Sequence, residues 1–223
     1  MSDNQKDYLN DDKVGQGKHV VQYGECLDSI SLKYGFFWET LWNHGENSDL
    51  RSVRKDPFVL LKGDKVCIPD LRPKQENRPV DAHHRFIRKG MPSRLKVQLL
   101  EEDIPLADER YTLDVEGSVL ISGVTDANGW LDERIKPNAR HAILRLESGA
   151  EYRLDLGGLD PVTTLSGLQA RLHNLGFECS AEKGKLGPLT EGAIRAFQGK
   201  HGLETSGDPD EQMLSKLIEI HGC

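Results

Sequence analysis

The sequence predicts a multi-domain α+β protein built from three small modules. Three observations lead to this prediction. Near the N-terminus short β-branched runs flank residues at helical spacing, the middle of the chain alternates apolar and polar residues, and helical spacing returns near the C-terminus. With 223 residues, of which 37% are hydrophobic and 29% charged, the chain suits several small cores better than one large core.

The predicted boundaries follow shifts in composition. In chain order they give a flexible leader (residues 1–17), a βααβ module (18–70), a linker (71–90), a small antiparallel β-sandwich (91–162) and a three-helix bundle (163–223). The leader is polar and rich in Asn, Asp, Gln and Gly. The linker holds several Pro, Arg and Lys residues and has no clear period.

The βααβ module opens with a β-branched and aromatic strand over residues 19–23. Apolar residues at helical spacing follow, and Gly35 ends that helix as glycines at helix C-termini commonly do. A second helix is expected over 37–42. A long polar loop over 44–56 and a closing strand over 65–68 complete the order strand, helix, helix, strand.

The middle of the chain has the pattern of a small antiparallel β-sandwich. Short runs that read as strands occur at residues 95–99, 111–115, 119–121, 143–146 and 152–156. Between them lies Asp126-Ala127-Asn128-Gly129, which we interpret as a tight turn. A calcium loop is disfavoured there because the terminal bidentate Glu is out of register.

The C-terminal part predicts three helices. The first has its leucines on one face and ends at Gly176. Thr190 is expected to cap the second helix, and Gly202 to end it. Met213 opens the apolar face of the third.

Charge excludes two classes of partner. The net charge is −7, with 36 acidic against 29 basic residues. Such a chain lacks the positive field that nucleic acids and anionic membrane surfaces attract, so we expect neither as a partner. There is no run of about 18 apolar residues and no apolar signal sequence at the N-terminus, so we expect synthesis in the cytoplasm without a signal peptide.

The reactive side chains form no recognisable catalytic or metal set. The four cysteines, Cys26, Cys67, Cys179 and Cys223, match no CxxC motif, so free thiols are expected, with a Cys26–Cys67 disulfide left open. His83-His84 has no further ligands nearby in the sequence. We therefore expect no catalytic residues, no metal and no cofactor.

Residues 19–35, HVVQYGECLDSISLKYG, and 61–69, LKGDKVCIP, resemble the LysM domain. The resemblance implies binding of N-acetylglucosamine-containing glycans such as peptidoglycan and chitin. In that family the groove lies between the first strand–helix loop and the loop after the second helix. Carried over, the glycan-binding positions are Gly24, Glu25, Cys26, Leu27, Asn47, Ser48, Asp49 and Leu50.

Residues 165–177, LSGLQARLHNLGF, and 183–217, KGKLGPLTEGAIRAFQGKHGLETSGDPDEQMLSKL, resemble a peptidoglycan-binding domain that often accompanies cell-wall hydrolases. The positions that fit its pattern include Gln169, Thr190 and Gln198. For Gln198 we expect a hydrogen bond to a buried backbone group. A contact with a peptide stem is the alternative.

The arrangement as a whole is similar to proteins associated with bacterial type VI secretion clusters. The stretch 37–70, which contains LWNHGEN and KDPFVLLKGD, carries this resemblance, together with VTDANGWL and the ending HGC. It implies an accessory protein of a secretion or effector system, delivered to the periplasm or cell envelope by that device.

The function expected from these features is non-catalytic binding of peptidoglycan glycan chains, with a secretion-system or effector protein as a second partner. The alternative is an adaptor, chaperone or structural partner of a type VI secretion effector or spike protein, without wall binding. A wall hydrolase with a site not visible in the sequence is a third hypothesis.

Overall fold

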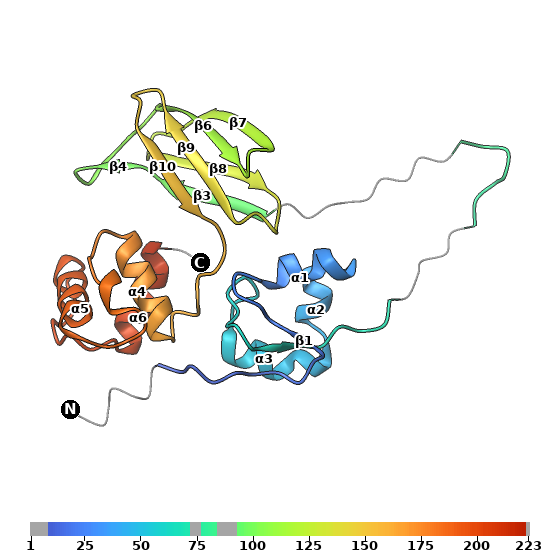
Figure 1. The fold of residues 1–223 in the computed structure, drawn as a ribbon, viewed down its shortest axis with the longest axis horizontal. Helices are drawn as coiled ribbons and strands as arrows, with labels where there is room; N and C mark the ends of the chain where they lie inside the picture. Colours follow the sequence, from blue (N-terminus) through green and yellow to red (C-terminus); the bar gives the residue numbers. More distant parts are fainter. Residues whose placement is uncertain (1–8, 72–76, 84–92, 222–223) are drawn as a thin grey trace. The chain divides into compact units, whose positions relative to one another are not determined.

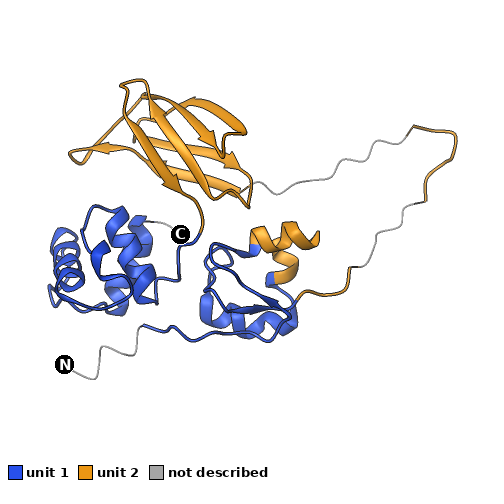
Figure 2. Cartoon of the chain, viewed as in Figure 1, with its two compact units in different colours: residues 1–27, 42–67, 158–223 blue, residues 28–41, 68–157 orange. Residues whose placement is uncertain are grey.

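The computed structural model describes residues 9–71, 77–83 and 93–221. The architecture is mixed α and β with small antiparallel sheets, as predicted. The chain divides into two compact units, shown in Figure 2. One unit contains residues 1–27, 42–67 and 158–223, and the other contains 28–41 and 68–157. The division therefore passes through the stretch predicted as the N-terminal module.

That stretch contains two short strands with helices between them (Figure 1). Strands β1 and β2 pair antiparallel, with His19 opposite Val66. The elements in chain order are β1 His19–Val20, α1 Leu27–Tyr34, α2 Trp38–Trp42, the 3₁₀ helix η2 Gly45–Asn47, α3 Ser48–Arg54 and β2 Lys65–Val66.

The prediction of a long loop over 44–56 is wrong, because η2 and α3 occupy most of it. Helix α3 has Leu50 and Arg54 buried at i and i+4, and its other residues are exposed or half-buried. Its inward face thus has one apolar residue and one charged residue. This pattern looks like a polar loop in the sequence. Lys55 ends the helix in the left-handed conformation, at φ 59°.

A buried carboxylate, Asp64, joins three segments of the first unit. Its oxygens accept hydrogen bonds from Arg54 Nε at 2.7 Å and Nη2 at 2.8 Å. They also accept the backbone N–H groups of Leu61 at 2.9 Å and Val14 at 3.0 Å. The side chains of Asp64 and Arg54 are both fully buried. Helix α3, the turn before β2 and the segment before β1 are therefore held by one side chain.

Part of the segment predicted as a flexible leader is bonded to β2. The N–H of Lys65 donates to the carbonyl of Val14 at 2.8 Å, and Arg54 Nη2 donates to the carbonyl of Asp12 at 2.5 Å. Gly15 has φ +90°, and a Cβ at Gly17 would lie 1.8 Å from the Val66 carbonyl carbon. Only glycine allows the backbone to approach the strand this closely.

The second unit holds an antiparallel β domain, the β3–β10 region of Figure 1. A four-stranded sheet has the order β10-β9-β6-β7, and two-stranded sheets pair β3 with β8 and β4 with β5. The strands are β3 Ser93–Gln98, β4 Leu100–Glu101, β5 Ile104–Pro105, β6 Arg110–Val115, β7 Val119–Val124, β8 Trp130–Ile135, β9 His141–Leu146 and β10 Glu151–Asp155. Leu113 and Leu144 of the large sheet share one core with Leu131 of β8, so two sheets contribute to it.

Strand β8 was not predicted, because three of its six residues are charged. Within Trp130–Ile135 only Leu131 is fully buried, at 1% exposure. The strand pairs with β3, and Arg94 Nη2 lies 2.8 Å from Asp132 Oδ2 across the pair. The tight turn predicted before β8 is confirmed: the Asp126 carbonyl accepts the N–H of Gly129 at 2.9 Å.

The C-terminal helical domain belongs to the first unit. It contains α4 Leu165–Asn174, the 3₁₀ helix η3 Ser180–Glu182, α5 Pro188–Lys200 and α6 Glu211–His221 (Figure 1). Phe197 lies fully buried in its core, at an edge-to-face angle of 78° to Phe177. The helix ends predicted at Gly176 and Gly202 are confirmed, since both glycines follow the helix caps with φ above +60°.

Thr190 does not cap α5, which corrects the prediction. The helix begins two residues earlier, at Pro188, after the N-cap residue Gly187. Proline is favoured at the first helical position because it needs no N–H partner there. Thr190 is instead fully buried inside the first turn.

Three further observations complete the fold. Within the described residues no helix is long and apolar enough to cross a membrane. Cys26, Cys67 and Cys179 form no disulfide, so Cys26 and Cys67 are not joined to each other. Cys223 and His84 lie outside the described residues.

Removal of the Asp64 carboxylate tests its structural role. We expect Asp64→Ala to destabilise this part of the chain by about 3–5 kcal/mol, because the buried Arg54 guanidinium loses its counter-charge. The measurement is native-state hydrogen exchange at the amides of Val21 and Gly63, which bond to Asp64 O and Val21 O. The exposed Asp11→Ala variant should change protection by less than about 0.5 kcal/mol. Equal protection in both variants would contradict the role.

Candidate functional site

The helical domain fixes its loops with buried side-chain amides. Gln169 on α4 donates from Nε2 to the carbonyl of Lys185 at 2.9 Å and to Thr190 Oγ1 at 2.8 Å. Its Oε1 accepts the N–H of Gly184 at 2.6 Å. One side chain therefore holds the loop between η3 and α5 against α4.

Gln198 on α5 holds the loop that leads into α6 in the same way, through hydrogen bonds to its backbone. It is fully buried, and its Nε2 donates to the carbonyl of Asp208 at 3.0 Å. Its Oε1 accepts the N–H of Gly207 at 2.9 Å. The prediction that Gln198 bonds a buried backbone group is confirmed.

Glu182 supplies the acceptors that the N-terminus of α5 lacks. The N-cap residue is Gly187, which has no side chain to accept the first N–H groups. Glu182 instead accepts the N–H of Leu189 at 2.9 Å and of Thr190 at 2.7 Å. Burial raises the pKa of the Glu182 carboxyl, but the hydrogen bonds from Thr190 and the α5 backbone outweigh it, so that the pKa is lowered.

An open, mostly apolar groove crosses the first half of α5. It has a volume of about 360 Å³ and is lined by Gly176, Phe177, Glu178, Pro188, Leu189, Gly192, Ala193 and Ala196. Leu189 is 48% exposed. A Cβ built at Gly192 would meet no heavy atom within 4 Å. The groove is therefore open over Gly192, and the Glu178 carboxylate supplies its one acidic side chain.

Comparison with known proteins bears on this domain. Residues 165–217 match a peptidoglycan-binding family. The matching family model is described as "Putative peptidoglycan binding domain". The resemblance predicted for the C-terminal part is thus confirmed, and the match implies peptidoglycan as a partner. No curated protein and no solved structure matches the chain.

The matched residues 165–217 contain both the buried amides and all eight groove positions. The matched residues of this chain therefore include both interior and exposed positions. Residues such as Gln169 and Gln198 satisfy backbone groups in the interior. Residues such as Leu189 and Gly192 face solvent and are open to a ligand.

The first group of glycan-binding positions predicted near the N-terminus, residues 24–27, forms the turn before α1 and the first residue of that helix. Gly24 has φ +77°, which favours glycine. Glu25 accepts the N–H of Gln22 at 2.9 Å and pairs with His19 Nε2 at 2.8 Å, so its side chain supports the turn. Cys26 is half-buried, and Leu27 is fully buried.

The second group, residues 47–50, spans the end of η2 and the start of α3. Asn47 and Leu50 have no exposed surface, whereas Ser48 and Asp49 are exposed. Gln16 Nε2 donates to Asp49 Oδ2 at 3.4 Å. Within this group, a glycan could therefore meet the side chains of Ser48 and Asp49 only. Glycan binding at all eight positions stays a prediction.

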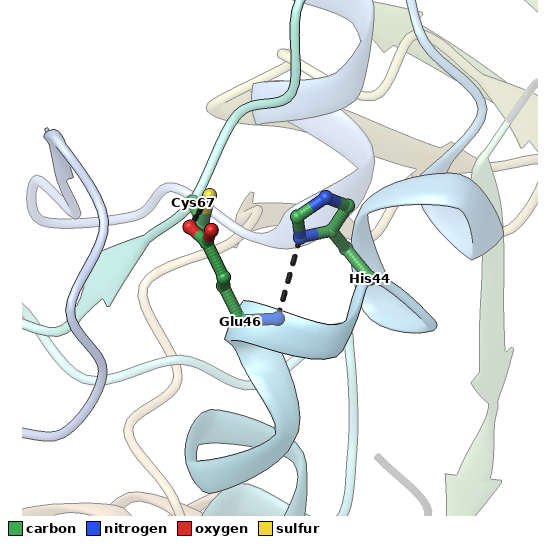
Figure 3. Close-up of side chains that lie close together, drawn as sticks. All are labelled: His44, Glu46 and Cys67. Carbon is green, nitrogen blue, oxygen red and sulfur yellow. Dashed lines mark hydrogen bonds between the residues drawn. The ribbon is translucent and has the colours of Figure 1, made fainter.

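A cluster of three side chains, His44, Glu46 and Cys67, lies beside this second group (Figure 3). This cluster was not predicted from the sequence. The Cys67 thiol donates to Glu46 Oε2 at 2.8 Å, and His44 Nδ1 accepts the N–H of Glu46 at 3.4 Å. The hydrogen bond to Glu46, followed by burial and the Glu46 charge, raises the pKa of Cys67 to about 11. The His-x-Glu spacing was visible in the sequence. Its meeting with Cys67, 21 residues after Glu46, depends on the fold.

The lowered pKa of Glu182 predicts acid sensitivity of the helical domain. A depressed carboxyl pKa adds stability above the ordinary value of 4.5, and this stability is lost as the pH falls through the lowered pKa. We expect Glu182→Gln to lower the unfolding temperature of the domain at neutral pH and to reduce its decline in acid. Thermal unfolding followed by circular dichroism from neutral to acid pH measures both. Glu204→Gln, at an exposed carboxyl of the same domain, should keep the acid decline of the parent protein. An unchanged decline in Glu182→Gln would contradict the assignment.

Proposed function

We propose that this chain binds peptidoglycan without catalysis, through the groove on α5 of its helical domain. The observation that carries the proposal is the family match over residues 165–217, which includes every residue that lines the groove. The groove suits a binding surface because small side chains leave it open, and Gln169 bonds Thr190, the residue after the lining residue Leu189.

The chemistry of the groove fits peptidoglycan. Its apolar floor, formed in part by Ala193 and Ala196, can take the methyl groups of acetamido substituents and of alanyl residues. Glu178 can accept a hydrogen bond from an amide or amine of the same polymer. No wide positive field is required for such a ligand, which agrees with the net charge of −7.

The N-terminal module is proposed as a second binding site, for N-acetylglucosamine units. Its support is the LysM resemblance and the exposure of Ser48 and Asp49, two of the predicted glycan positions. Two modest sites on one chain raise the overall affinity for a polymer through effective concentration.

We further propose that the chain serves as an accessory protein of a secretion or effector system that delivers it to the cell envelope. The resemblance to type VI secretion-associated proteins over residues 37–70 supports this role. The second candidate function is an adaptor for an effector or spike protein. Burial of Leu27, Asn47 and Leu50 favours it, since three of the eight predicted glycan positions offer no side-chain surface.

A groove-filling substitution tests the main proposal. We expect Gly192→Gln to weaken sedimentation of the full chain with purified peptidoglycan sacculi by about tenfold or more, because the new side chain occupies the groove and displaces the ligand. The fold should persist, since a Cβ at this exposed helical position meets no heavy atom within 4 Å.

Gly199→Gln is the matched control, on the same helix but outside the groove. A Cβ there meets only Thr205 Cγ2, at 3.6 Å, so this variant should bind sacculi like the parent protein. Equal binding by both variants would remove the groove from the proposal. No sedimentation of the parent protein at micromolar concentration would overturn peptidoglycan binding and leave the adaptor function.

The second site has its own test. We expect the double variant Ser48→Ala, Asp49→Ala to bind a soluble N-acetylglucosamine oligomer about tenfold more weakly in calorimetric titration, since it removes the polar groups exposed at the predicted groove. Ser52→Ala, on the same helix but outside the predicted positions, is the control. If the oligomer binds the double variant and the parent equally, these two positions do not contact glycan.

A further inference from the structure

The residues His44, Glu46 and Cys67 place three different metal-binding groups at one point of the first unit (Figure 3). One ligand atom from each lies within 4.8 Å of the other two. A tetrahedral zinc ion with bonds of about 2.0–2.3 Å needs ligand atoms roughly 3.5 Å apart. Modest side-chain rotations therefore bring the three groups into range.

The backbone around these side chains is held in place. Asn47, which is fully buried, pairs with both backbone groups of Cys67. Its Oδ1 accepts the Cys67 N–H at 2.7 Å, and its Nδ2 donates to the Cys67 carbonyl at 2.9 Å. These two bonds fix the chain after β2 against η2, so the Cys67 side chain stays beside Glu46. Preorganisation of this kind lowers the entropic cost of metal binding.

We propose that His44, Glu46 and Cys67 form a zinc-binding site, with water completing a tetrahedral coordination shell. One imidazole nitrogen, one carboxylate oxygen and the thiolate sulfur are the protein ligands. A mixed nitrogen, sulfur and oxygen set suits Zn²⁺, whereas Mg²⁺ and Ca²⁺ favour oxygen ligands alone.

The metal would replace the proton of the hydrogen bond that the Cys67 thiol donates to Glu46. On binding, the S–H bond breaks, a sulfur–zinc bond forms and the proton leaves to solvent, with no change of oxidation state. The thiolate and the carboxylate together neutralise the two charges of the ion. Glu46, which accepts the thiol hydrogen bond at 2.8 Å, becomes a ligand beside it.

This site would join η2 to the end of β2, two segments that Asn47 already connects. Zinc that binds only the folded form would stabilise this part of the chain according to its free concentration. The inference does not depend on peptidoglycan binding, since none of the three ligands belongs to the α5 groove or to the eight predicted glycan positions.

The test uses the full chain, reduced and freed of metal with a chelator. We expect one Zn²⁺ per chain in competition with a chromogenic chelator. We also expect that Co²⁺ bound in its place gives a near-ultraviolet sulfur-to-cobalt charge-transfer band. Cys67→Ser should abolish the band and weaken Zn²⁺ binding by about a hundredfold, and Glu46→Gln should weaken it by about tenfold, because each removes an anionic ligand.

Cys26→Ser is the matched control, because Cys26 is also a half-buried cysteine of this unit outside any disulfide. It should keep the cobalt band and the zinc affinity of the parent protein. His44→Asn gives a second variant, whose side-chain oxygen can still accept the Glu46 N–H while the imidazole is lost. It should weaken Zn²⁺ binding and keep the circular dichroism spectrum. A parent protein without a cobalt–thiolate band, or zinc affinity unchanged in Cys67→Ser, would overturn the proposal.

Discussion

Asp64 illustrates the constraint on which the small cores of this chain depend. A short module buries too few apolar side chains to fix all of its loops, so buried polar side chains must hold several segments each. Asp64 holds α3, the turn before β2 and the segment before β1 through four hydrogen bonds from Arg54, Leu61 and Val14. In the helical domain, Gln169 and Gln198 do the same for the loops that flank α5.

The same constraint explains which parts of the fold were predictable. Where apolar residues alone face the core, as along β6, their period identifies the element and its boundaries. In α3 and β8 charged residues stand beside the few buried apolar ones, and the period is hidden. Arg54 is the inward residue that made α3 look like a loop, and the charged residues around Leu131 concealed β8. The capping of α5 was hidden as well, because Glu182, which accepts an N–H of its first turn, lies outside the helix.

The candidate sites were less predictable than the fold, because they depend on open volume at the surface and on contacts between residues that are distant in the sequence. The C-terminal pattern of Gln, Gly and Thr residues indicated the family, yet most of these residues lie inside the domain and support its loops. The groove is open over Gly192 because this residue has no side chain. In the sequence Gly192 is one of 22 glycines, and nothing distinguishes it from the others. Leu27, Asn47 and Leu50 were named from a motif, and the structure assigns their side chains to the interior.

Asn47 connects the proposals made for the N-terminal module. It ends η2, whose Glu46 is a proposed zinc ligand, and it directly precedes Ser48 and Asp49, which are proposed to meet glycan. Its side chain also sets the position of Cys67. An ion held by His44, Glu46 and Cys67 would restrict η2 and therefore the start of α3. Restriction of a binding segment before the ligand arrives lowers the ordering cost at that step, so metal and glycan would strengthen each other's binding.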